Sequence, residues 1–175
     1  MYATYRRDTQ SAWLGMWRQV GAKNKIRKVT PDGVVTTFAG TGTQGHADGD
    51  LSIATFNRPD GIALNTKIGI LYIADTQNNV IRKITTDGMG NPVTVSTLAG
   101  SGTSGLIDGT GANAAFNNPE GITIDANGNL FVADRANNTI RKVTPGGDVT
   151  TIAGQQGMIG DTDGPGRHSH LQVPP

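Results

Sequence analysis

The chain has 175 residues, with 25 glycines and no cysteine, so it offers room for one ordinary domain and excludes disulfides and thiolate metal sites. Its net charge is +1, but residues 31–175 carry eight basic and thirteen acidic side chains, a balance of −5 that disfavours a nucleic-acid surface. No apolar run approaches the ~20 residues of a membrane helix. We therefore expect a soluble protein with many turns and short elements.

The first segment in chain order, residues 1–20, matches nothing else in the sequence. Its apolar residues recur at spacings of three and four: Trp13, Met16, Trp17 and Val20. This spacing predicts a short helix, or else an irregular leader that caps an exposed sheet edge. A membrane-surface helix that uses the nearby arginines is the less favoured alternative. The segment lacks the continuous apolar core of a secretory signal, so the sequence predicts no cellular compartment.

From residue 21 onward the chain repeats itself every 54 to 60 residues. "LYIAD" at 71–75 returns as "LFVAD" at 130–134. "VIRKITTDG" at 80–88 returns as "TIRKVTPGG" at 139–147, and "KIRKVTPDG" at 25–33 precedes both. Self-similarity at this period indicates a row of equivalent structural units, each too small to bury its own faces.

Each unit contains four short apolar or β-branched runs, separated by turn residues. In the last complete unit they are "GITID" (121–125), "LFVAD" (130–134), "TIRKVT" (139–144) and "DVTTIA" (148–153). The "ANGN" between the first two is a tight-hairpin signal, and no helix-length segment intervenes. Four strands joined in this way make an antiparallel meander. Such sheets stack around an axis in a β-propeller, and a solenoid of the same repeats is the competing architecture.

The repeat resembles the NHL repeat, which forms a β-propeller blade. The resemblance rests on Pro-x-Gly-Ile, then Leu-[Tyr/Phe]-[Ile/Val]-Ala-Asp, then Asn-x-Ile-Arg-Lys-[Ile/Val]-Thr. These occur at Pro59–Ile62, Leu71–Asp75 and Asn79–Thr85, and again at Pro119–Ile122, Leu130–Asp134 and Asn138–Thr144. The resemblance implies an all-β fold, an incomplete propeller of four-stranded antiparallel blades.

The same resemblance divides the chain into a leader, a propeller segment and a tail. The leader is 1–20, the propeller segment 21–166 and the tail 167–175; the propeller segment holds a half blade at 25–40, full blades at about 56–100 and 116–154, and the start of another cycle at 155–166. The family usually closes a ring of about six blades. We therefore expect the ring to be completed by the remainder of a larger protein or by further copies of the chain.

Meander geometry predicts a binding face at one end of the blades. The loops between the second and third strands share this end with the connections that lead into the first strand. Side chains there differ between blades while their framework is constant, as in repeat proteins that bind partners. The predicted contact residues for a protein partner are Arg58, Asp60, Gln77, Asn118, Glu120, Arg135 and Asn137.

Two aspartates, Asp75 and Asp134, each end a predicted strand just before an asparagine-containing turn. We expect each carboxylate to accept hydrogen bonds from the backbone amides of the turn, or to pair with the arginine of the next strand, Arg82 or Arg141. Because the pattern recurs in both blades, a structural role is favoured over a catalytic or calcium-binding one. Neighbouring side chains on a strand point to opposite faces, so one member of each Arg-Lys pair should tie adjacent blades together.

The resemblance leaves catalysis open, because related propellers include amidating lyases and lactonases, whose His and carboxylate ligands converge on the axis. Only His46 lies inside the repeats. The Asp-Gly loops and the spacing of His168 and His170 are compatible with a metal, but turns and a solvated tail explain them better. We expect a non-catalytic scaffold without metal or cofactor. RNA binding is the weakest alternative, because the body has few aromatic residues for base stacking.

Overall fold

The computed structural model describes residues 3–4, 16–19, 24–87, 91–158, 160 and 164–166. These residues form three antiparallel sheets and short 3-10 turns, and none of them belongs to a helix long and apolar enough to cross a membrane. The three sheets follow one another along the chain, and we name them blades I, II and III. The expected all-β fold of an incomplete propeller is confirmed.

Blade II is the sheet of the first full repeat. Its strands are β5 (Gly49–Asp50), β6 (Pro59–Asn65), β7 (Ile70–Asp75), β8 (Val80–Thr86) and β9 (Pro92–Ala99), with a 3-10 turn at Thr76–Asn78. Their order in the sheet is β5-β9-β8-β7-β6. The predicted four-strand meander is therefore present, and the short β5 extends it beyond the outer strand.

Blade III repeats this arrangement. Its strands are β10 (Gly109–Thr110), β11 (Pro119–Ile124), β12 (Leu130–Asp134), β13 (Thr139–Val143) and β14 (Asp148–Ala153), with 3-10 turns at Gly111–Asn113 and Arg135–Asn137. The sheet order is β10-β14-β13-β12-β11. In both blades a long loop, residues 41–58 or 101–118, brings the chain in from the preceding blade. We call these two segments the entering loops.

Blade I differs from the half blade expected at 25–40. Its sheet has the order β1-β2-β3-β4 and consists of β1 (Ala3–Thr4), β2 (Met16–Gln19), β3 (Ile26–Val29) and β4 (Val35–Ala39). The helix expected around Trp13–Val20 is wrong at Met16–Gln19, which is a strand; the rest of that helix lies outside the described residues. The physical reason is the free edge of β3, whose backbone groups pair with β2.

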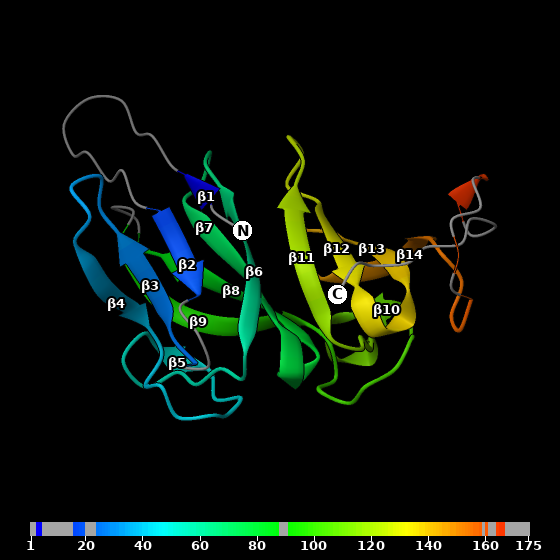
Figure 1. Cartoon of the computed structure of the whole chain (residues 1–175), viewed down its shortest axis with the longest axis horizontal. Helices are drawn as coiled ribbons and strands as arrows, with labels where there is room; N and C mark the ends of the chain where they lie inside the picture. The colour runs from blue at the N-terminus through cyan, green and yellow to red at the C-terminus, as the bar shows by residue number, and fades with distance from the viewer. Residues whose placement is uncertain are drawn as a thin grey trace.

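The inner strands of successive blades lie next to each other. Figure 1 shows β6 and β11 side by side in the middle of the molecule, with β1 close to β6. The approach of β6 to β11 is so close that a Cβ on Gly61 would collide with the backbone oxygen of Glu120. This explains the glycine of the Pro-x-Gly-Ile pattern, because a larger residue at Gly61 would push the two strands apart.

Two apolar clusters fill the spaces between the blades. The first joins Ile26 and Ala39 of blade I to blade II, where Phe56, Ile73 and Ile84 belong to the same cluster. The second joins blades II and III, and its members are Ala63, Tyr72, Ala74, Ile81, Leu98, Ala99, Ala114, Phe116, Ile122, Leu130, Val132, Val143 and Val149. The facing sides of neighbouring sheets are thus buried against each other, as a propeller requires.

Candidate functional site

Arg82 lies at the centre of a buried polar network in blade II. Its Nη1 donates to the Asp75 carboxylate at 2.9 Å and to the backbone oxygen of Thr55 at 3.0 Å. Its Nη2 donates to the Asp48 carboxylate at 2.6 Å and to the backbone oxygen of Ala47 at 2.9 Å. The guanidinium carbon stands 5.2 Å from the centre of the Phe56 ring, within cation–π distance. We call this arrangement the arginine cradle.

Blade III contains the same arrangement around Arg141. Its guanidinium pairs with Asp134 and with Asp108, each at 2.9 Å. It also donates to the backbone oxygens of Ala115 and Ile107, and it stands 5.0 Å from the centre of the Phe116 ring. The predicted pairing of each aspartate with the arginine of the next strand is therefore confirmed in both blades.

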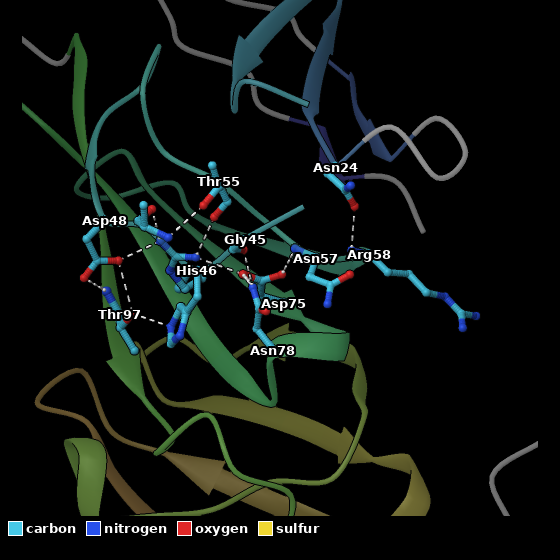
Figure 2. A network of polar contacts seen from close by, with 12 residues as sticks. Asn24, Gly45, His46, Asp48, Thr55, Asn57, Arg58, Asp75, Asn78 and Thr97 are labelled. Atoms are coloured by element: carbon cyan, nitrogen blue, oxygen red, sulfur yellow. Dashed lines mark hydrogen bonds and ion pairs between the residues drawn. The ribbon is translucent and has the colours of Figure 1, made fainter. Parts of the chain in front are cut away.

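The inner carboxylate of each cradle also holds the entering loop and the turn. Oδ1 of Asp75 accepts the backbone N–H of Asn57 at 2.8 Å, and Oδ2 accepts the side-chain amide of Asn78 at 2.8 Å (Figure 2). Burial raises the pKa of the Asp75 carboxyl above the ordinary aspartate value, although these bonds and Arg82 favour the charged form. The backbone donor belongs to the entering loop, whereas the sequence suggested the turn itself.

The cradle anchors a loop to its own blade. Four of the Arg82 contacts come from the entering loop: Ala47, Asp48, Thr55 and Phe56. The expectation that one member of the Arg-Lys pair ties neighbouring blades together is therefore wrong for Arg82 and Arg141. The reason is that each arginine folds under the chain segment that leads into its own sheet.

Asparagine side chains make one set of links between blades, beside the bonds of the Thr76 hydroxyl to the Pro119 oxygen and of the Lys67 ammonium to the Ala126 oxygen. Oδ1 of Asn24 in blade I accepts the backbone N–H of Arg58 at 3.0 Å (Figure 2). Oδ1 of Asn79 in blade II accepts the backbone N–H of Asn118 at 2.9 Å. Both asparagines have positive φ, 47° and 54°. Our sequence reasoning missed this role, although an asparagine precedes each Ile-Arg-Lys by two residues, at Asn24, Asn79 and Asn138.

The predicted binding face divides into exposed residues and framework residues. Arg58 and Gln77 are exposed, Asp60 is half-buried, and Figure 2 shows the Arg58 side chain pointing away from the polar network. Arg135 and Glu120 lie together, with Nη1 of the arginine 3.4 Å from the glutamate Oε1. These five residues lie at one end of blades II and III, and we call this surface the rim. The structure places them there as the meander geometry predicted.

Asn137 does not belong to the rim. Its side chain is 1% exposed and donates to the backbone oxygen of Gly105 and to Asp134. Asn118 contributes its backbone N–H to the link with Asn79, at a φ of 52°. The sequence grouped Asn137 with the contact residues because loop position predicts exposure, whereas this amide satisfies a buried carboxylate.

One polar residue breaks the equivalence of the blades. Nε2 of His46 lies 3.2 Å from the Thr97 hydroxyl, which also donates to Asp48 (Figure 2). Leu106 occupies the corresponding position before the Asp-Gly of blade III. Among the residues that the structure describes, no three His, Cys, Asp or Glu side chains come together as a group that could hold a metal ion. His168 and His170 lie outside the described residues.

The sequence of this propeller segment matches a known family model. The model is the SMP-30/gluconolactonase/LRE-like region, and the match covers residues 8–154. The chain belongs to this family. Relatives of this SMP-30/gluconolactonase/LRE-like chain include the human NHL repeat-containing protein 2, 37% identical over 89 residues, and the chloroplastic protein SUPPRESSOR OF QUENCHING 1 of Arabidopsis thaliana, 42% identical over 71 residues. The resemblance to NHL propellers is thereby confirmed.

These relatives are much longer than the matched region. The match to the human protein covers 51% of this chain and 11% of that protein, and the match to the Arabidopsis protein covers 41% and 6%. The chain therefore spans only a small part of the length of the curated relatives that it matches.

Solved structures show the same fold. A Bacteroides thetaiotaomicron protein of unknown function superimposes with a TM-score of 0.66 at 31% identity, covering 74% of this chain and 32% of that one. An auxiliary nutrient binding protein from the same species gives a TM-score of 0.68 at 18% identity, with 90% and 38% coverage. Virginiamycin B lyase of Staphylococcus aureus gives 0.50 at 20% identity, with 82% and 39% coverage. At under 25% identity, the last two show the fold alone.

Proposed function

We propose that this propeller segment is a non-catalytic scaffold that binds a protein partner at the rim. One observation carries the proposal. The buried charged residues of blades II and III have the same partners in both blades, whereas the exposed rim positions differ. Conserved geometry with changing side chains is how a repeat protein builds a contact surface on a fixed frame.

The differences at the rim lie at equivalent positions. Arg58 of blade II corresponds to Asn118 of blade III, and both have a φ near 50°. Gln77 corresponds to Ala136 in the two 3-10 turns. The rim is thus cationic in one blade at a place where it is neutral in the next. An unequal pattern of charge and amide groups suits a partner that contacts several blades at once and selects one orientation.

The family also contains proteins named as lactonases and the fold includes a lyase, so an enzyme is the second candidate. The feature that favours it is His46, because its contact with Thr97 has no counterpart in blade III. Catalytic groups are expected to be asymmetric in a repeat fold. Against it, every carboxylate buried with an arginine here repeats from blade to blade, which suits support of the loops.

The test compares the rim with the opposite end of the same blade. The variants are Arg58→Ala and the double change Glu120→Ala with Arg135→Ala; the control is Lys67→Ala, an exposed cation in the β6–β7 loop at the far end. Each purified chain is immobilised and then incubated with an extract of its source cells. The proteins that it retains are quantified by mass spectrometry. We expect the rim variants to lose proteins that the original chain and Lys67→Ala retain. Equal retention by all chains would contradict the proposal.

The enzyme candidate has a separate readout. The chain is assayed for hydrolysis of simple lactones with added Ca²⁺ or Zn²⁺, and His46→Ala is assayed beside it. Turnover that disappears in His46→Ala would establish the enzyme and remove the scaffold proposal. We expect no turnover above that of the buffer with either ion.

A further inference from the structure

Among the described residues, side chains on the outward face of blade III are more exposed than those on the same face of blades I and II. We call the face that a blade turns toward the next blade in the chain its trailing face. In blade II this face includes Ile81 and Leu98, and Leu98 is 7% exposed. Ile140 pairs with Ala153 as Ile81 pairs with Ala99, so Ile152 corresponds to Leu98. Ile152 is 37% exposed.

The rest of the trailing face follows the same pattern. Tyr72 and Ala74 of blade II are buried against blade III. Their counterparts by strand register, Phe131 and Ala133, are half-buried. An aromatic ring and an isoleucine on an open sheet face form an apolar surface that soluble proteins usually cover. Blade III therefore presents half of an interface of the kind that joins blades II and III.

Blade I presents the other half. We call the face that a blade turns toward the preceding blade its leading face. Val35, Val95 and Val149 are equivalent by strand register in blades I, II and III. Their cross-strand partners are Val29, Ile84 and Val143. Val95 and Val149 are 0% and 2% exposed, but Val35 is 46% exposed. The leading face of blade I thus shows the residues that its counterparts in blades II and III bury.

The polar parts of the two open faces also correspond. Arg27 occupies the register position of Arg82 on the leading face, and its Nε donates to the backbone oxygen of Thr36 at 3.2 Å. Asn138 has the φ of 54° that Asn79 uses to reach the next blade. Blade III therefore carries an asparagine suited to link blades, and blade I carries a half-buried arginine at the register position of Arg82, at opposite ends of the three-blade row.

We propose that the trailing face of blade III docks on the leading face of blade I of a second copy of this chain. Two copies in this head-to-tail arrangement would make two identical contacts and close a ring of six blades. The contact is heterologous, because different surfaces meet, and a half-turn between the copies satisfies both contacts. The proposal does not depend on a partner at the rim.

Solution mass tests this pairing. Multi-angle light scattering of the purified chain should give about twice the 18.3 kDa chain mass. Ile152→Asp places a charge on the trailing face, and Val35→Asp places one on the leading face; each should halve the mass. Ile68→Asp, an equally apolar and exposed position on the β6–β7 loop outside both faces, is the matched control and should leave it unchanged. Circular dichroism checks that every variant keeps the strand spectrum.

Mixing the two variants distinguishes head-to-tail docking from other pairings. Ile152→Asp retains an intact leading face and Val35→Asp an intact trailing face, so an equimolar mixture has one complete contact and should regain the dimer mass. The proposal would be overturned if the original chain were a monomer or a polymer larger than two copies. It would also be overturned if the dimer survived each single change, or if the mixture stayed monomeric.

Discussion

Blades II and III differ from blade I in the surroundings of the arginine of the Ile-Arg-Lys pattern. Arg82 and Arg141 are fully buried between two carboxylates, whereas Arg27, in the same strand register, is half-buried and bonds to its neighbouring strand. By strand register Gln19 corresponds to Ala74, so the sequence of blade I has Val20 at the position of the cradle aspartate Asp75. The Ile-Arg-Lys pattern therefore does not make a cradle by itself. The cradle needs the aspartate that ends the second strand and the loop that enters the blade.

The largest expected effect comes from removing the arginine. Arg82→Met leaves Asp75 buried without its cation, which should lower the free energy of unfolding by about 3–5 kcal/mol. Arg27→Met removes a partly exposed guanidinium and should cost less than about 1 kcal/mol. Urea denaturation followed by circular dichroism measures both. Equal losses would show that the cradle contributes nothing beyond an ordinary strand position.

A second comparison sets one glycine of blade II against its counterpart in blade III. Gly61→Ala places a methyl group against the backbone oxygen of Glu120, and overpacking of this kind costs about 1–3 kcal/mol. Gly121→Ala meets only the Ala133 Cβ, at an ordinary 3.5 Å. We expect a clear fall in the thermal midpoint for the first variant. The Gly121→Ala change is measured on the monomeric Ile152→Asp background. A fall of the same size there would show that the close approach of β6 to β11 is not the cause.

The smallest expected effect separates the link between blades from backbone strain. Asn79→Ala and Asn138→Ala both put alanine at a φ of 54°, so the cost of that conformation is the same in both. Only Asn79 accepts the N–H of Asn118, so it should lose about 1 kcal/mol more than Asn138 in urea denaturation. In a dimeric chain the comparison is made on the monomeric Ile152→Asp background. Identical losses there would mean that the link carries no stability.

Sequence predicted the parts of this structure that depend on local pattern. The repeat was sufficient for the four-strand meander, and the pairing of Asp75 with Arg82 follows from residues seven apart on adjacent strands. The sequence did not predict strand β2, because Met16–Gln19 shares no letters with "LYIAD" and its pairing is set by the free edge of β3. The sequence did not predict the hydrogen bond of Asn79, because its partner, the Asn118 N–H, lies 39 residues away in the next blade.

The same limit applies to the candidate site. Arg58 and Gln77 lie at the expected end of blade II, because the position of a loop in a meander follows from strand order. Asn137 was misplaced because its neighbours, Gly105 and Asp134, come together only when the entering loop folds back. Local spacing predicts which end of a blade a residue occupies, and the path of a long loop decides whether its side chain is free.

The central claim is that each cradle anchors the loop that enters its own blade. Hydrogen–deuterium exchange with mass spectrometry tests it on Asp48→Ala and Asp108→Ala, which each remove the partly exposed carboxylate of one cradle. Asp48→Ala should speed exchange in residues 41–58 and leave 101–118 unchanged, and Asp108→Ala should do the reverse. Unchanged exchange in both loops, or faster exchange in both loops with either variant, would contradict the claim.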